Sequence, residues 1–419
     1  RSMFSCGMTR YACKEGCNYD LCKNCFETHI YRKTTETPAQ ITPTATSQSS
    51  ISCGKVGVHS LDDKESCKAA NKEAFELAHA QWCRNYIAQE PIRYEDLKVV
   101  GLMGCGGFGY VELVEDKGVV YAMKNVDKGY TVKTGNVDSV LNEKRLMQLM
   151  DSPFIIKLFT TYNLKTSVVF LLEAALGGEL YATYNRKGLH GKEPHAQFYA
   201  SSIGVGLEYM HSMKVIYRGA NPENIVLARD GHVKLADFGL SKMVVSLTYT
   251  TCGVPDYFAP EVIASTGHNR GVDWWSLGVM IFELLAGHPP FESATPMQIY
   301  SKVIKGIAKV KFPQSICNPA AVLIKELLKQ KPTERLPMQQ GGFENFKNAK
   351  WYRGFDWESL ETRSMTPPYI PWISSETDIS NFQANLEDKP RPVGYKGEHA
   401  DRFKEFDMSL MCQDSSSGP

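Results

Sequence analysis

Three glycines at a fixed spacing point to phosphate chemistry in this chain. Gly104, Gly106 and Gly109 form a GxGxxG pattern, with Val111 two residues further on. Glycine allows the backbone to approach a phosphate closely and to donate its N–H groups to the phosphate oxygens. Taken alone, an ordinary hairpin turn explains the pattern better, so the interpretation needs support from other residues.

A lysine and a glutamate downstream of the glycines supply that support. Lys124 ends the apolar segment 120–124, and Glu143 lies in the segment 141–145. A lysine at the end of a strand is usually a surface residue, and a glutamate on a helix is usually solvated. In this order and at this spacing, however, they resemble the phosphate clamp of protein kinases. The combination favours a nucleotide phosphate as the ligand.

The elements that must position these residues change in type along the chain. Residues 99–116 and 118–127 predict two strands around a glycine turn and then a third strand, and 167–174 predict a buried strand. Helices are expected at 137–151, 194–213, 272–286 and 320–328. We therefore predict an α+β fold with two lobes, a small β-rich N-lobe followed by a large helical C-lobe.

Composition bounds the class of protein. The 419 residues are 43% hydrophobic, which is enough for one large two-lobed domain with additional segments. The net charge of +1 gives no reason to expect nucleic acid or an anionic membrane as partner. The longest apolar stretch, 274–287, is too short to span a bilayer, so no transmembrane segment is expected. Because the chain begins with Arg1, we expect a fragment of a longer protein.

Cysteines concentrate at the N-terminus. Five of the 12 lie within the first 25 residues, which suggests a local metal site in a reducing, cytoplasmic environment rather than a disulfide framework. The spacing of Cys13, Cys17, Cys22 and Cys25 resembles the second half of a ZZ-type zinc finger. It departs from that pattern in the three-residue gap of its first pair. These four thiolates are therefore predicted to bind zinc.

The predicted organisation has five parts. They are a Cys-rich segment at 1–33, a flexible linker at 34–63, a helix at 64–93, a kinase-like body at 94–355 and a C-terminal tail at 356–419. The linker assignment follows from its Thr, Ser and Pro content and its lack of large apolar residues.

The body resembles the AGC group of serine/threonine protein kinases, most closely the cyclic-nucleotide-dependent members. The resemblance covers roughly residues 94–406. The motifs that carry it lie at 141–145, 177–179, 231–239, 250–253, 259–261, 272–275 and 287–291. It implies a bilobal protein-kinase fold with an AGC C-terminal tail, and ATP and Mg²⁺ as cofactors.

The resemblance also implies a complete nucleotide site. Lys124 would hold the α- and β-phosphates and pair with Glu143, while Asn224 and Asp237 would bind magnesium. The remaining expected nucleotide contacts are the glycine loop (Gly104, Gly106, Gly109), the adenine pocket (Met103, Val111, Ala122, Val226), the hinge with its gatekeeper (Leu172, Glu173, Ala175), Glu179, and Phe382 from the tail.

The catalytic loop departs from the family pattern. Gly219 stands where the family has the aspartate that accepts the hydroxyl proton, and Asn221 replaces the lysine that places a positive charge on the transferring phosphoryl group. Val254 occupies the position of a threonine that usually bridges those two residues. All three members of one hydrogen-bonded set are therefore lost, and no intact catalytic residue is expected.

Regulatory and peptide-binding positions are retained. Thr250 matches the activation-loop phosphosite, and Arg218 and Lys242 occupy the places that pair with its phosphate. Further residues match other family positions: acids that select basic peptides (Glu179, Glu223, Glu283), tail-docking aromatics (Phe403, Phe406), an apolar stack between the lobes (Met147, Leu158, Tyr217, Phe238) and a buried pair (Glu261, Arg335). The partners implied are basic Ser/Thr peptides or a pseudosubstrate regulatory segment, and upstream regulatory domains.

Three hypotheses follow from this sequence. The first is a kinase-like protein that binds Mg-ATP and basic peptides but transfers phosphate poorly or not at all. The second is an active cyclic-nucleotide-dependent-type kinase that uses a substitute base, since positioning and magnesium contribute much of phosphoryl transfer. The third is a non-catalytic zinc-finger adaptor whose kinase body is a folded spacer. ATP binding separates the third from the others, and turnover separates the first two.

Overall fold

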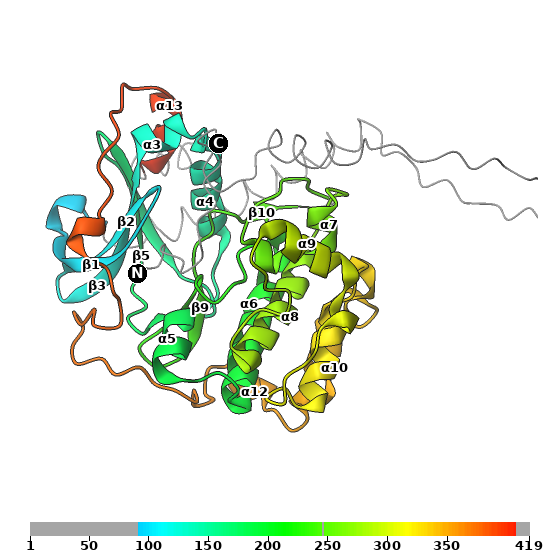
Figure 1. The fold of residues 1–419 in the computed structure, drawn as a ribbon. Coiled ribbons are helices and arrows are strands. Elements are labelled where there is room, and N and C mark those ends of the chain that lie inside the picture. Colours follow the sequence, from blue (N-terminus) through cyan, green and yellow to red (C-terminus); the bar gives the residue numbers. More distant parts are fainter. Residues whose placement is uncertain (1–90, 245–246, 408–419) are drawn as a thin grey trace, which may run out of the picture.

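The computed structural model describes residues 91–244 and 247–407, which form two lobes (Figure 1). Within these residues the N-lobe is built on an antiparallel sheet in the order β1-β2-β3-β5-β4. Its strands are β1 (Lys98–Gly106), β2 (Gly109–Asp116), β3 (Val119–Asp127), β4 (Leu158–Asn163) and β5 (Ser167–Glu173). The bilobal protein-kinase fold expected from the sequence is confirmed.

Two apolar clusters hold the sheet, one on each face. Val111, Leu113 and Ala122 belong to the cluster that faces the C-lobe and the tail residue Phe382. Val114 and Tyr121, their neighbours along the strands, belong to the other cluster. The alternation follows from the two-residue period of β-strands, which sends successive side chains to opposite faces. The sheet can therefore present one apolar face to a ligand and keep the other for its own core.

Two helices lie between β3 and β4. They are α3 (Lys128–Lys133) and α4 (Val137–Leu149). The carboxylate of Asp127 caps α3 by accepting a hydrogen bond from the backbone N–H of Tyr130 at 2.6 Å. Helix α4 carries Glu143 on a buried face, so this glutamate is not the solvated side chain that an isolated helix would predict.

The C-lobe is mainly helical, and most of its core surrounds α6 and α8 (Figure 1). Its helices are α5 (Leu180–Lys187), α6 (Glu193–Ser212), α7 (Pro260–Ile263), α8 (Gly271–Ala286), α9 (Pro296–Lys305), α10 (Asn318–Leu327), α11 (Phe343–Lys347) and α12 (Trp357–Glu361). Helix α8 ends at Gly287, whose φ of 86° places it in the left-handed region that glycine adopts readily.

Short strands frame the cleft on the C-lobe side. They are β6 (Gly178–Glu179), β7 (Val215–Ile216), β8 (Ile225–Leu227), β9 (Val233–Leu235) and β10 (Lys242–Met243). Strands β6, β8 and β9 form one sheet, and β7 pairs with β10. The loop between β7 and β8 contains residues 217–224, and Asp237 lies two residues after the end of β9. The predicted catalytic loop and magnesium ligand are thus both placed by these strands.

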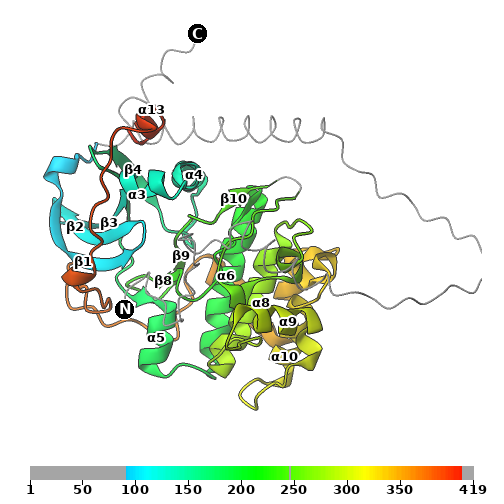
Figure 2. The same cartoon turned by 45° about the horizontal axis from the view of Figure 1, so that its top comes forward.

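The tail runs from the C-lobe back to the N-lobe. After α12 it has little regular structure until α13 (Ala400–Phe403), and Figure 2 shows its last part passing the sheet to reach α13. Short 3₁₀ helices complete the described chain: η1 (Tyr94–Asp96), η2 (Pro255–Tyr257), η3 (Ile307–Lys309), η4 (Pro332–Glu334), η5 (Leu336–Met338), η6 (Lys350–Tyr352), η7 (Leu386–Asp388) and η8 (Lys404–Phe406).

Two further observations concern the sequence expectations. No helix in the described part of the chain is long and apolar enough to cross a membrane. The predicted Cys-rich segment, the linker and nearly all of the predicted helix at 64–93 lie outside the described residues, as does the end of the tail.

Candidate nucleotide and peptide site

A cavity of about 570 Å³ lies between the lobes and contains most of the predicted nucleotide positions. The predicted residues that line it are Met103, Val111, Ala122, Lys124, Glu143, Leu172, Glu173, Ala175, Val226, Asp237 and Phe382. Ile156 and Ala236 also line it, although neither was assigned a nucleotide contact from the sequence.

A buried ion pair marks the inner part of this cavity. The Nζ atom of Lys124 lies 2.6 Å from Oε1 of Glu143 and 3.4 Å from Oδ1 of Asp237. Burial opposes the charged amine, but the two carboxylates outweigh burial and hold the pKa of Lys124 above its usual value. One lysine that remains charged therefore brings together strand β3, helix α4 and Asp237, two residues after β9.

The glycine loop is the hairpin that joins β1 to β2. Gly106 pairs with Gly109 across it, Gly104 pairs with Val111, and the turn itself consists of Gly107 and Phe108. A Cβ atom on Gly109 would lie 1.8 Å from the backbone oxygen of Asn125 on β3, so only glycine fits there. The glycine pattern therefore forms a hairpin turn, and its role as a phosphate loop stays a prediction. None of the three patterned glycines lines the cavity within the described residues.

The catalytic loop is held by a buried aspartate on α8. Asp273 accepts hydrogen bonds from the backbone N–H groups of Tyr217 at 2.9 Å and Arg218 at 2.7 Å, and it also pairs with His211 at 2.7 Å. These contacts fix the backbone immediately before Gly219. The loop that contains Gly219 and Asn221 is therefore anchored to α8.

None of the three described heavy atoms nearest to a Cβ built at Gly219 belongs to a carboxylate. The three heavy atoms nearest to a Cβ built at Gly219 are Nδ2 of Asn224 at 3.1 Å and two ring carbons of Tyr217 at 3.4 and 3.6 Å. The φ of Gly219 lies outside the left-handed region, so the backbone does not itself require glycine. The position could accept a side chain if Asn224 moved by a few tenths of an ångström.

The side chain of Asn221 stabilises a turn in its own loop. Its side-chain Oδ1 accepts hydrogen bonds from the backbone N–H groups of Glu223 at 3.0 Å and Asn224 at 3.2 Å, and the residue is buried. This is a side-chain-to-backbone turn of the kind that Asn favours. A lysine has only donors and cannot make these bonds. The side chain at this position is therefore turned toward its own loop.

Two residues offer oxygen atoms for a magnesium ion. The amide nitrogen of Asn224 donates to the backbone oxygen of Gly219 at 3.1 Å, which leaves its Oδ1 for another partner. Asp237, at a φ of 53°, uses one carboxylate oxygen to accept from Gly239 N at 3.1 Å. Oxygen donors suit Mg²⁺, which usually keeps waters and substrate phosphates as its other ligands. The described residues contain no larger cluster of His, Cys, Asp and Glu that could hold a metal alone.

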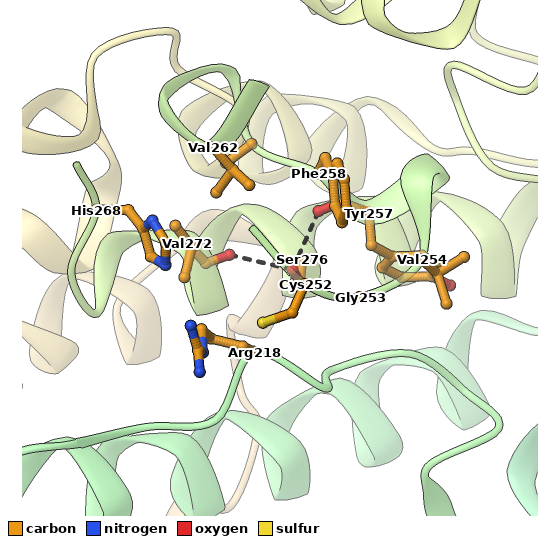
Figure 3. A pocket seen from close by; sticks show the side chains of 11 residues that line it. Arg218, Cys252, Gly253, Val254, Tyr257, Phe258, Val262, His268, Val272 and Ser276 are labelled. Carbon is orange, nitrogen blue, oxygen red and sulfur yellow. Dashed lines mark hydrogen bonds between the residues drawn. The ribbon is translucent and has the colours of Figure 1, made fainter. Parts of the chain in front are cut away.

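A second cavity, of about 340 Å³, borders the activation segment (Figure 3). Arg218, Cys252 and Val254 line it. Val254 is partly buried and packs against the core, so it contributes apolar contact where a threonine could have donated a hydrogen bond. The third predicted departure from the family pattern therefore also leaves the loop without a polar bridge.

The predicted phosphosite Thr250 is exposed. Its backbone oxygen accepts a bond from Nη1 of Arg218 at 3.3 Å. The amine of Lys242 instead contacts the hydroxyl of Thr248 at 2.9 Å. Arg218 is thus already beside Thr250, whereas Lys242 is engaged two residues away.

Two of the three predicted peptide-binding acids, Glu179 and Glu283, have raised pKa values. Burial, followed by the nearby Glu223 carboxylate, raises the pKa of Glu179 to about 8. Burial raises the pKa of Glu283 to about 7, although a hydrogen bond from the Tyr257 hydroxyl opposes that shift. Glu179 is nine-tenths buried, and no donor in the described part of the chain bonds to its carboxylate. A positively charged ligand would stabilise the ionised form of these buried carboxylates.

Two aromatic residues of the tail pack against the N-lobe. Phe403 and Phe406 are completely buried, and the Phe406 ring packs edge-on against Phe170 with centroids 5.2 Å apart. Arg145 of α4 binds the Glu405 carboxylate through two hydrogen bonds of 2.9 and 2.6 Å. Helix α4, which carries Glu143, is therefore buttressed by the tail.

Other predicted structural residues also lie where expected. The apolar stack Met147, Leu158, Tyr217 and Phe238 is buried in the main core. Arg335 binds Glu261 through two hydrogen bonds of 2.6 and 2.7 Å in a fully buried position.

Two tail contacts were missed by the sequence reasoning. Lys389 pairs with Glu112 at 2.9 Å and lies 3.8 Å from the Tyr110 ring centroid, so the tail also covers the glycine hairpin. The Asn381 side chain donates to the backbone oxygen of Leu176 at 3.2 Å. No local pattern marks these residues, since each contact joins positions more than 200 residues apart in the chain.

Comparison with known proteins identifies this arrangement. Residues 97–348 match the family model described as protein kinase domain. The chain belongs to the protein kinase family. Membership implies ATP and Mg²⁺, and the residues present fit them. The cavity combines apolar walls with the charged Lys124 and the carboxylate of Asp237, and Asn224 of the loop before β8 offers a further oxygen.

This kinase chain is also similar to several curated relatives. It is 39% identical over 337 residues to cGMP-dependent protein kinase, isozyme 1, of Drosophila melanogaster, covering 78% of this chain and 44% of that protein. It is 40% identical over 303 residues to cGMP-dependent protein kinase 2 of Mus musculus, covering 71% and 40%. The chain thus spans less than half the length of these relatives. The likeness supports the AGC-type serine/threonine assignment.

The zinc prediction has no structural counterpart. Cys13, Cys17, Cys22 and Cys25 lie outside the described residues. Zinc at the N-terminal segment therefore stays a prediction.

Proposed function

We propose that this kinase-like protein binds Mg-ATP and basic Ser/Thr peptides, and that its transfer of the phosphoryl group is lost or strongly attenuated. The proposal depends on two residues of the predicted catalytic loop and on the cavity beside it. Gly219 has no side chain, and Asn221 is committed to the backbone of its own turn. The nucleotide cavity beside this loop has kept its charged and apolar residues.

The chain's own residues suggest how binding would work. Met103, Val111 and Ala122 from the sheet, with Val226 below them and Phe382 from the tail, offer apolar surfaces to an adenine ring. Lys124, fixed by Glu143, would hold the phosphates. Asn224 and Asp237 would hold the magnesium ion. ATP, when bound with Mg²⁺, supplies the phosphoryl group and neutralises its developing charge.

Catalysis would fail at two points. A hydroxyl group arriving at Gly219 finds no carboxylate to accept its proton or to aim its oxygen. The neutral Asn221 places no positive charge on the transferred group. General-base catalysis typically contributes ~10²–10⁴-fold, and losses within one catalytic unit do not simply add. A residual rate several orders of magnitude below that of an intact kinase is compatible with these changes.

The second candidate is an active kinase with a substitute base. It is favoured by one observation: Lys124, Glu143 and Asp237 are already assembled. It requires a carboxylate near the acceptor hydroxyl, and none of the atoms nearest to the Gly219 Cβ position belongs to one. The zinc-finger adaptor, the domain limits at 94–355 and 356–419, and regulation by upstream domains stay predictions.

Two measurements on the purified protein test the proposal. Thermal unfolding with and without Mg-ATP measures binding, and we expect a clear rise in Tm. Phosphate transfer to a basic Ser/Thr peptide measures catalysis, and we expect little or none. A vigorous rate in the wild type would contradict the proposal and favour the second candidate, while no rise in Tm would favour the adaptor.

A further inference from the structure

An aromatic contact ties the tip of the glycine hairpin to α3. Phe108, one of the two turn residues, is 40% exposed, yet its ring meets the Tyr130 ring edge to face, with centroids 5.4 Å apart and an interplanar angle of 86°. This geometry places the positive edge of one ring on the negative face of the other. The exposed tip of the hairpin therefore has an attractive partner outside the sheet.

Two backbone contacts accompany the ring pair. A Cβ atom built at Gly107 would lie 3.2 Å from the hydroxyl oxygen of Tyr130, so this side chain lies directly against the turn. The backbone N–H of Asp127, which caps α3, donates to the backbone oxygen of Phe108 at 2.9 Å. Both residues of the turn thus contact α3 or its cap.

The C-terminal tail contacts α3 and the residue that caps it. One oxygen of Asp127 binds the Tyr130 N–H at 2.6 Å, and the other accepts from the backbone N–H of Val393 at 3.3 Å. A Cβ atom on Gly129 would lie 2.4 Å from the Val393 backbone oxygen, which shows how closely the tail passes over the helix. The Lys128 amine lies 5.3 Å from the centroid of the buried Phe403 ring.

We propose that Tyr130 is a positioning residue that holds the tip of the glycine hairpin over the nucleotide phosphates, and that tail residues 393–403 set its position. The inference rests on the proposed nucleotide binding. It assigns a role to α3 and the tail that is separate from the support of α4 by the tail through Arg145 and Glu405.

The expected effect is pre-organisation of the loop. A glycine-rich hairpin loses more backbone freedom on ordering than other segments, and a ligand that closes it must supply that free energy. Tyr130 reduces this cost before the ligand arrives. The contact should therefore raise the affinity for ligands that carry phosphates. It should not change the affinity for adenosine, because the adenine would contact the strands and hinge rather than the turn.

The test compares three variants with the wild type. Tyr130→Ala removes the ring, and Tyr130→Phe removes only the hydroxyl that lies against Gly107. Tyr94→Ala is the matched control, because Tyr94 forms another edge-to-face pair in the same lobe, 5.4 Å from Tyr162. Backbone amide exchange over residues 104–111 is measured without nucleotide. Dissociation constants are measured for Mg-ATP and for adenosine.

We expect Tyr130→Ala to accelerate exchange over 104–111 and to weaken Mg-ATP binding by roughly 2- to 10-fold, with adenosine binding unchanged. Tyr130→Phe keeps the ring, so its exchange over 104–111 and its affinity for Mg-ATP should stay close to those of the wild type. Tyr94→Ala should leave exchange over 104–111 as in the wild type.

Two results would overturn the inference: unchanged exchange in Tyr130→Ala, or equal weakening of Mg-ATP and adenosine. If the wild type binds neither ligand, the proposed function fails separately. Amide exchange over residues 104–111, measured without nucleotide, then decides whether Tyr130 holds the turn. Faster exchange in Tyr130→Ala than in the wild type supports that role, and equal exchange refutes it.

Discussion

The side-chain oxygen of Asn221 accepts a hydrogen bond from the backbone N–H of Asn224 at 3.2 Å. The residue that replaces the family lysine is thus bonded to the residue that is expected to bind magnesium. The change at Asn221 is therefore integrated into the fold of the loop. This integration makes the substitution testable by stability as well as by activity.

Restoring both catalytic side chains should restore transfer. We expect Gly219→Asp with Asn221→Lys to raise peptide phosphorylation by at least ~10²-fold, since a general base alone typically contributes ~10²–10⁴-fold. The φ of Gly219 allows the aspartate, although the amide of Asn224 must shift slightly. Initial rates with a basic Ser/Thr peptide measure the effect. An equally fast wild type would refute the account of the loop.

The same restoration should lower stability. Asn221→Lys loses two hydrogen bonds to backbone N–H groups, and we expect a cost of about 1 kcal/mol, or a Tm lower by about 2–4 °C. Asn385→Lys is the control, because Asn385 is exposed and its side chain caps no helix. Thermal unfolding compares the two variants. Equal Tm values for them would mean that the turn at Asn221 contributes nothing to stability.

Nucleotide binding should depend on Lys124. Lys124→Met removes the charge while keeping an apolar stem, and we expect it to abolish the Tm rise caused by Mg-ATP. The buried Glu143 is then left without its cation, which lowers the Tm of the free protein as well. Lys98→Met, at an exposed end of β1, is the control and should keep the full rise. A retained rise in Lys124→Met would exclude this cavity as the phosphate site.

Binding of basic peptides should strengthen as the pH rises from 6 to 8. The pKa of Glu179 is raised to about 8 and that of Glu283 to about 7, so both are partly protonated over this range. A cationic side chain favours the ionised carboxylate, hence binding releases protons and is weaker where protons are abundant. Each proton released changes affinity by up to about tenfold per pH unit below the pKa.

Titration calorimetry in buffers of different ionisation enthalpy measures those protons. Glu179→Gln should release fewer protons and flatten the pH dependence, whereas Glu358→Gln, an exposed change on α12, should alter neither. Affinity that does not vary between pH 6 and pH 8 would rule out the buried acids as the peptide contact.

Tail docking should stabilise the N-lobe. Phe406→Ala empties a fully buried site against Phe170, and we expect a loss of about 3–5 kcal/mol. Leu386→Ala, at a tail residue that is 76% exposed, should change stability little. Denaturant unfolding followed by a probe in the N-lobe compares them. A loss below about 1 kcal/mol in Phe406→Ala would show that the tail is not an integral part of the lobe.

Much of the fold could be predicted from local patterns. The helix expected at 194–213 is α6 at Glu193–Ser212, and that expected at 272–286 is α8 at Gly271–Ala286. Residue periodicity determines such elements, because one face of each must be buried. The order of motifs also indicated the family, and the family implied that Lys124, Glu143 and Asp237 would meet.

The sequence by itself determined what is missing from the catalytic loop, since a glycine at 219 has no side chain in any fold. Only the tertiary structure decided what the remaining residues do instead. The turn formed by Asn221, the pKa of Glu179 and the contact of Tyr130 with Phe108 each depend on distances between groups. Hydrogen bonds and ring contacts act over a few ångströms, and desolvation depends on burial, so folding must first bring these groups together.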